Sequence, residues 1–287
     1  MFATIGRSWE FAKISYRVLW DFKQLIVFPI FSATAAILVT ASFVWPLWQS
    51  GTLEQWISVS EQEGTEGNVG MYITLFLFYF LNYFVIIFFN SALTACAMKV
   101  VGGEPPSIGY GLRMAGSRIH QIFGWALVSA VIGVVLRAIE GANERAGQFI
   151  AAILGSAWTA LTFFVVPVIV MEGLSPVAAF KRSLGILKST WGEALMGNFS
   201  LGFLGFLLTV PVVLLTGVLV YGAVQSGSIV LLVVASVLGV GLIALSIATS
   251  AAADVVFKAI LFNHATGKTL PDNIDTASLS DAFVSRS

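Results

Sequence analysis

Five long stretches of this sequence carry no charged residue, and their length constrains the fold more than any other feature. They cover residues 24–53, 67–98, 119–136, 146–171 and 194–253. A helix that crosses a bilayer needs about 20 predominantly apolar residues, so each stretch allows one crossing. The last stretch is long enough for two crossings and contains a turn signal, Gln225-Ser226-Gly227-Ser228, near its middle.

The sequence therefore predicts an all-α, polytopic membrane helix bundle with six transmembrane helices in one membrane domain, residues 1–287. The predicted spans cover about residues 25–48, 70–98, 119–138, 147–171, 195–224 and 229–261. Composition agrees, because 57% of the residues are hydrophobic and 10% are charged, against roughly 45–50% and 25% in soluble domains. A water-soluble chain cannot hide that much apolar surface.

The basic residues lie almost entirely on one side of the predicted membrane. Of the 15 Lys and Arg residues, only Arg137 and Arg145 fall on the other side, where residues 50–68 add four glutamates and no base. Basic loops face the cytoplasm in most multi-pass proteins. We therefore expect a protein of the cell (inner) membrane with both termini in the cytoplasm.

Three cytoplasmic segments, which precede spans one, three and five, have the apolar periodicity of amphipathic helices. In the first, the apolar face is Ile5, Trp9, Ala12, Tyr16 and Leu19, opposite a charged stripe of Glu10, Lys13, Arg17 and Asp21. The second covers residues 108–119. The third begins at Ser175 and Pro176, with an apolar face of Val177, Phe180, Leu184 and Leu187.

Helices of this kind suit the headgroup layer of an anionic inner leaflet. Two other interpretations stay open, a collar packed on the cytoplasmic ends of the spans and a docking helix for a partner protein. The predicted partners are the lipid bilayer, with its anionic inner leaflet, and either another membrane protein or a second copy of the chain. No nucleic acid is expected. The residues predicted at this cytoplasmic interface are Arg7, Lys13, Glu172, Lys181 and Arg182.

An internal repeat appears when residues 103–127 are aligned with residues 171–195. The alignment pairs Glu104 with Glu172 and Arg113 with Lys181. It predicts three parallel copies of one unit, an amphipathic helix followed by a transmembrane hairpin. We expect each of the two glutamates to form a salt bridge with a basic residue that follows it.

Three stretches carry a resemblance to a known family: Phe88-Phe89-Asn90-Ser91-Ala92-Leu93, the segment from Trp158 through Pro167 to Gly173, and the segment from Lys181 through Thr190 to Glu193. By these motifs the chain resembles a family of uncharacterised six-helix polytopic membrane proteins of about this length. More remotely, it is similar to the membrane domain of glycerophosphoryl diester phosphodiesterases. The resemblance implies membership without an activity, because the family has none assigned and the soluble phosphodiesterase domain is absent here.

Polar residues within the spans define the candidate site. Ser246, Ser250, Asp254 and Lys258 recur at every fourth position and share one helix face. A carboxylate with two hydroxyls suits cation coordination or proton relay. The alternative, which we favour, is that Asp254 lies at the membrane boundary and pairs with Lys258.

Other polar residues in the spans predict contacts between helices. Asn90 is expected to bond across to another helix, with Asn198 or the indole of Trp158 as partners, and a substrate contact is the alternative. Prolines in spans one, four and five, Pro29, Pro167 and Pro211, predict kinks.

Catalytic and cofactor chemistry finds no support in the sequence. The sequence has two histidines, His120 and His264, and one cysteine, Cys96, whereas a metal centre needs several His, Cys or carboxylate ligands that converge. No cofactor is predicted. The favoured function is a non-enzymatic membrane-organising or accessory bundle, the alternative is a permease or channel for a small or amphipathic molecule, and a membrane enzyme comes third.

Overall fold

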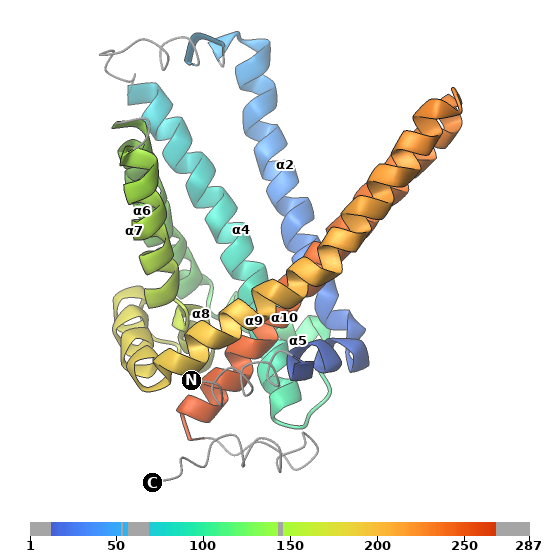
Figure 1. The fold of residues 1–287 in the computed structure, drawn as a ribbon. Coiled ribbons are helices and arrows are strands. Elements are labelled where there is room, and N and C mark those ends of the chain that lie inside the picture. The colour runs from blue at the N-terminus through green and yellow to red at the C-terminus, as the bar shows by residue number, and fades with distance from the viewer. Residues whose placement is uncertain (1–12, 53, 57–68, 143–145, 268–287) are drawn as a thin grey trace. The chain divides into compact units, whose positions relative to one another are not determined.

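The computed structural model describes residues 13–52, 54–56, 69–142 and 146–267, without the side chains of 142 and 191–200. Within these ranges there are helices and no strand, which confirms the all-α prediction there (Figure 1). A helix over 13–21 is followed by η1 (Lys23–Ile26), α2 (Val27–Gln49), α4 (Val69–Val101), α5 (Ile108–Ser117), α6 (Ile119–Ala142), α7 (Ala146–Leu161), α8 (Val165–Glu172), α9 (Pro176–Gln225) and α10 (Ile229–Ala265).

Six helical segments among the described residues are long and apolar enough to cross a membrane, as predicted. They are Lys23–Gln49, Val69–Val101, Ile119–Gly141, Ala146–Glu172, Leu201–Gln225 and Ile229–Ala265. The apolar runs set the lengths of these segments, and the boundaries of the spans in a membrane stay a prediction. The chain is therefore a multi-pass membrane protein.

The backbone groups into two compact units. The first contains the described residues of Met1–Ile30, Cys96–Ile108 and Lys188–Ser287, and the second those of Phe31–Ala95 and Gly109–Leu187. In the first, the C-terminal half of α10 forms the core, with Phe257 and Ile260 fully buried. In the second, Ile122 and Phe164 are fully buried. The prediction of a single domain stays a prediction.

Much of the apolar surface is left uncovered, most clearly on α9 and α10. Leu214 on α9 is 64% exposed and Val237 on α10 is 66% exposed. In water such a surface drives aggregation, whereas lipid tails are as apolar as these side chains. The exposed faces are therefore suited to contact with hydrocarbon.

Three breaks in the helical backbone separate a short helix from the span that follows. Phe22 has φ −122° and ψ 63°, Arg118 forms a turn between α5 and α6, and Thr190 has φ −124° and ψ 19° inside α9. Furthermore, α5 begins at Ile108 and α9 at Pro176, positions that the repeat alignment pairs. Each short helix is thus free to take a direction that differs from that of its span.

The short helices bury part of each predicted apolar face within the protein. In the helix over 13–21, Leu19 is buried and Tyr16 half-buried, as expected, while Ile5, Trp9 and Ala12 lie outside the described residues. At the start of α9, Leu187 of the predicted apolar face is buried beside the small residues Ala179 and Ser183, while Val177 is 63% exposed. An exposed apolar side chain suits contact with lipid as well, so the amphipathic character of this helix stays a prediction.

The prolines act less uniformly than predicted. Span four is interrupted at residues 162–164, between α7 and α8, just before Pro167. The ring of Pro167 would clash with the carbonyl of the residue four positions earlier in a continuous helix, so the break is confirmed there. By contrast, Pro29 lies in the first turn of α2, where a missing N–H leaves no gap, and the backbone at Pro211 stays helical.

Candidate functional site

The polar side chains of the predicted stripe on α10 bond mainly to groups of the same helix. Ser246 donates to the carbonyl of Ile243 at 2.8 Å, and Ser250 donates to the carbonyl of Ser246 at 3.0 Å. One turn later, Lys258 Nζ lies 2.6 Å from Asp254 Oδ2, and both side chains are partly exposed. The ion pair expected between Asp254 and Lys258 is thereby confirmed, while the position of Asp254 at the membrane boundary stays a prediction.

Tyr16, from the short N-terminal helix, adds a hydroxyl to this stripe. Its OH donates to Ser250 Oγ at 3.3 Å across 234 positions of sequence. Burial raises the pKa of Tyr16 above its ordinary value of 10.0, the charge of Asp254 raises it further, and the bond to Ser250 lowers it by less than burial raises it. Tyr16 therefore stays a neutral donor at physiological pH. Sequence analysis placed Tyr16 on an apolar face, and no local pattern could have identified so distant a partner.

A glycine of α9 packs directly against this pair of hydroxyls. A Cβ at Gly205 would lie 3.0 Å from Ser250 Oγ and 3.7 Å from Tyr16 OH. Any larger side chain would therefore push the hydroxyls apart. The chain of hydrogen bonds runs from Tyr16 to Ser250 and ends on the carbonyl of Ser246. A backbone carbonyl has no proton to pass on, so this path by itself is not a proton wire.

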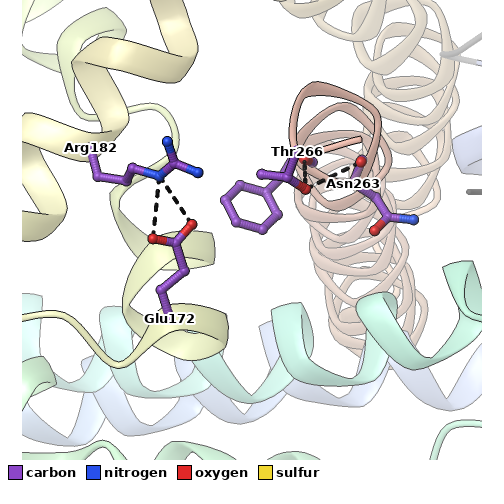
Figure 2. A network of polar contacts seen from close by, with 5 residues as sticks. Glu172, Arg182, Asn263 and Thr266 are labelled. Carbon is purple, nitrogen blue, oxygen red and sulfur yellow. Dashed lines mark hydrogen bonds and ion pairs between the residues drawn. The ribbon is translucent and has the colours of Figure 1, made fainter. Parts of the chain in front are cut away.

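A second cluster, in the other compact unit, lies where α8 ends. Figure 2 shows Arg182 with its Nε facing both carboxylate oxygens of Glu172, at 3.1 and 3.3 Å. The predicted salt bridge to a following basic residue is thus confirmed for Glu172. For Glu104 it was wrong, because Glu104 pairs with the preceding Lys99 at 2.9 Å. Gly103, with φ 81°, turns the chain back after α4 and brings Glu104 over the last turn of that helix.

Two side chains from the start of α6 hold the end of α8, and sequence analysis missed both. Arg118 Nε donates to the carbonyl of Val170, and Gln121 Nε2 donates to the carbonyl of Gly173, each at 3.4 Å. Gly173 has φ 67°, and a Cβ there would lie 2.5 Å from the Arg118 guanidinium. The left-handed backbone conformation favours glycine at this position, and the guanidinium of Arg118 occupies the space where a Cβ would lie.

Ser183 repairs the break in span four. Its hydroxyl accepts from the N–H of Phe164 at 3.1 Å and donates to the carbonyl of Leu161 at 3.0 Å. These are backbone groups that the interruption before Pro167 leaves without helical partners. Ser183 is 0% exposed, so water does not reach it. The only sequence signal was a hydroxyl among apolar residues on a helix face.

The remaining predicted residues are in part outside what the structure describes. Lys13 and Lys181 are exposed, Arg7 lies outside the described residues, and the side chain of Asn198 is not described. Asn90 is half-buried on α4, and its bond to another helix stays a prediction. By comparison, Asn82 donates to a carbonyl of its own helix, that of Phe78, at 2.9 Å. At the end of α10, the hydroxyl of Thr266 likewise donates to carbonyls of its own helix, those of Phe262 and Asn263 (Figure 2).

No group of three or more His, Cys, Asp and Glu side chains is placed to hold a metal ion among the residues that the structure describes. Cys96 is buried, and its thiol donates to the carbonyl of Ser107 at 3.2 Å. The prediction of no cofactor stays a prediction.

The chain matches a family model over most of its length. A family of unknown function, DUF6159, matches residues 69–270, which is more than half of the chain. No curated protein and no solved structure matches the chain. The predicted resemblance to an uncharacterised family of membrane proteins agrees with this match, whereas the remoter likeness to glycerophosphoryl diester phosphodiesterases has no support.

Proposed function

We propose that this chain, which belongs to the family of unknown function DUF6159, is a non-enzymatic membrane protein that organises lipid or supports a larger membrane complex. In this proposal six spans form three hairpins in the cell membrane, with both termini in the cytoplasm. Each hairpin is preceded by an amphipathic helix in the headgroup layer. The apolar spans face hydrocarbon, and the basic short helices attract anionic lipids.

The observation that carries the proposal is the local closure of polar groups in the spans. Hydroxyls on five of the spans donate to carbonyls of their own helix at 2.8–2.9 Å: Thr40 to Ala36, Thr74 to Gly70, Thr159 to Gly155, Thr216 to Val212 and Thr249 to Leu245. A hydroxyl bonded in this way presents no donor to a substrate. Spans so arranged offer hydrocarbon an apolar surface and offer a polar solute little.

Contacts between successive spans support the hairpins. Phe31 of α2 contacts Phe89 of α4, and Phe43 further along α2 contacts Phe78, which comes earlier in α4. The two helices are therefore antiparallel. In α9 and α10, Gly205 faces Ser250 and Thr216 faces Gly239, which is again an antiparallel register. In α6 and α7, Gly155 faces Leu136.

Exposed basic side chains on the short helices support contact with an anionic leaflet. They are Lys13 and Arg17 on the first, Arg113 on the second, and Lys181 and Lys188 on the third. Each Lys or Arg near an anionic membrane surface contributes about 1 kcal/mol of attraction. The aliphatic parts of Lys and Arg side chains can lie along apolar surface while their charged ends stay in the headgroup layer.

The test is enrichment of anionic lipid around the protein. The full chain is reconstituted in vesicles of phosphatidylcholine and phosphatidylglycerol in equal parts, and energy transfer from its tryptophans to a dilute headgroup-labelled lipid is measured. We expect more transfer to labelled phosphatidylglycerol than to labelled phosphatidylcholine, with the difference reduced in high salt. Equal transfer to the two lipids would contradict the proposal.

A second candidate is a permease or channel for a small or amphipathic molecule. The contact of Tyr16, Ser250 and Gly205 next to the Asp254–Lys258 pair favours it, because ionisable groups near a bilayer often line pathways. It predicts a flux in loaded vesicles that Asp254→Asn abolishes and that the exposed-pair variant Glu104→Gln leaves intact. Vesicles without flux across protons, alkali cations and short amphipathic amines would remove it.

A further inference from the structure

An exposed tryptophan marks the end of the short N-terminal helix. Trp20 is 76% exposed, although it is followed directly by a segment with buried residues such as Leu25. The ammonium of Lys23 lies 5.0 Å from the centre of its ring, a cation–π contact. An indole with an apolar body and a polar N–H suits the boundary between water and hydrocarbon better than either phase.

The covalent structure fixes the depth of Trp20 in the membrane. The first span begins at Lys23, three residues further along the chain, so Trp20 cannot lie far from the headgroups. The non-helical backbone angles of Phe22 end the short helix before the span begins. In addition, Gln24 Nε2 donates to the carbonyl of Pro106 at 2.7 Å, which ties the start of the span to the loop after α4.

The short helix is held in one rotational orientation. Ser15 and Leu19 are buried on one side, and Tyr16 is bonded to Ser250 of α10. The opposite side, with Arg17 and Trp20, is therefore directed away from the compact unit. Within the described stretch 13–23, three basic residues, Lys13, Arg17 and Lys23, stand against one acid, Asp21, so this stretch carries a net positive charge.

We propose that Arg17, Trp20 and Lys23, here called the Trp20 face, form a binding site for an anionic phospholipid. Arg17 and Lys23 bind the phosphate and the charged headgroup, while the indole of Trp20 packs at the depth of the glycerol. The cation–π contact holds Lys23 beside the ring in advance, so less freedom is lost on binding. This inference rests on the proposed position of the short helices in the headgroup layer.

A lipid fits this face better than a protein partner does. The face lies within one helical turn of a transmembrane span, where phospholipid headgroups are the nearest and most abundant anions. Lys23 lies over the ring of Trp20, and Arg17 precedes Trp20 by three residues on the exposed side of the same helix, a pattern that suits a phosphate above an apolar region. A protein would have to approach within the headgroup layer itself.

The test measures lipid binding by native mass spectrometry of the detergent-solubilised full chain with phosphatidylglycerol or phosphatidylcholine. We expect the wild type to favour phosphatidylglycerol and Arg17→Gln/Lys23→Gln to lose about fivefold in affinity for each charge removed. Trp20→Ala should lower affinity for both lipids, and Trp20→Phe should lower it less. The matched control, Lys181→Gln/Lys188→Gln, removes two exposed charges from another short helix and should keep most of the preference.

The outcomes separate this inference from the proposed function. Equal losses in the two double variants would mean diffuse attraction and would overturn the Trp20 face while leaving the enrichment of anionic lipid intact. No preference in the wild type, together with no enrichment in vesicles, would overturn both. Arg17→Lys, which keeps the charge, should bind nearly as well as the wild type, and a loss equal to that of the double variant would count against electrostatic binding.

Discussion

The helix pairs α2/α4 and α9/α10 both run antiparallel, yet they meet through opposite kinds of side chain. In the first pair, rings form the contacts, with centroids 6.1 Å apart for Phe31 and Phe89 and 5.7 Å apart for Phe43 and Phe78. In the second, contact runs through glycine and small hydroxyl residues. Aromatic rings keep the helix axes further apart, so the contact can adjust to a change in side-chain size. Small residues let the two backbones approach closely, so a larger side chain at the contact does not fit.

The two pairs illustrate two ways of stabilising helix association in a membrane, where no hydrophobic effect drives helices together. Since lipid covers apolar surface as well as protein does, close van der Waals packing and short polar bonds carry the stability. We therefore expect the small-residue contact of α9/α10 to be far less tolerant of change than the aromatic contact of α2/α4.

The largest expected effect comes from Gly239→Leu. A Cβ at this position would overlap the side chain of Thr216, which is fixed by its bond to the carbonyl of Val212. We expect a loss of about 3 kcal/mol in the free energy of unfolding, measured in detergent micelles. Gly241→Leu, at an exposed position with open space around it, is the control and should cost little. Recovery of Gly239→Ala by Thr216→Ala would confirm the contact, and equal costs at 239 and 241 would break the comparison.

Ser183→Ala tests whether the loss of buried hydrogen bonds lowers the free energy of unfolding about as much as the loss of close packing does. The substitution leaves the N–H of Phe164 and the carbonyl of Leu161 without their partner. Leaving buried backbone groups unpaired should cost about 2 kcal/mol, read from the same unfolding measurement. Ser156→Ala removes an exposed hydroxyl bonded only to its own helix and should be nearly neutral. A larger cost for Ser183→Ala than for Gly239→Leu would reverse the ranking.

Phe43→Ala tests how much the aromatic contact between α2 and α4 contributes to stability. It removes the ring contact with Phe78, worth about 1 kcal/mol, and lipid fills the space that the ring leaves. Phe43→Leu should cost still less. If Phe43→Ala costs as much as Gly239→Leu, the aromatic contact is not the adaptable one.

The smallest effect is expected for Tyr16→Phe, which removes the bond to Ser250 and costs about 0.5 kcal/mol. Its signature is in the pH dependence. Because the pKa of Tyr16 is raised in the folded protein, its contribution is fully present below pH 10.0 and is lost as pH rises through the folded pKa. Above pH 10.0, the free energy of unfolding should decrease less steeply with pH in Tyr16→Phe than in the wild type. Identical slopes would contradict this expectation.

The sequence predicted what depends on the length and polarity of continuous segments. The six spans follow from apolar runs, and the Asp254–Lys258 pair follows from spacing within one helix turn. Contacts that depend on the fold were out of reach: Ser183 against the break in span four, Arg118 on Gly173, and Tyr16 on Ser250.

The most direct test of the account is whether the exposed faces of α9 and α10 contact lipid or water. Spin labels at single cysteines introduced at Leu214 and Val237, with the buried Cys96 left in place, report accessibility to oxygen and to a water-soluble nickel chelate in reconstituted vesicles. The account predicts high accessibility to oxygen and low accessibility to the chelate at both positions. Ready access of the chelate to either position would mean that these faces line water, and it would contradict the proposed lipid-facing bundle.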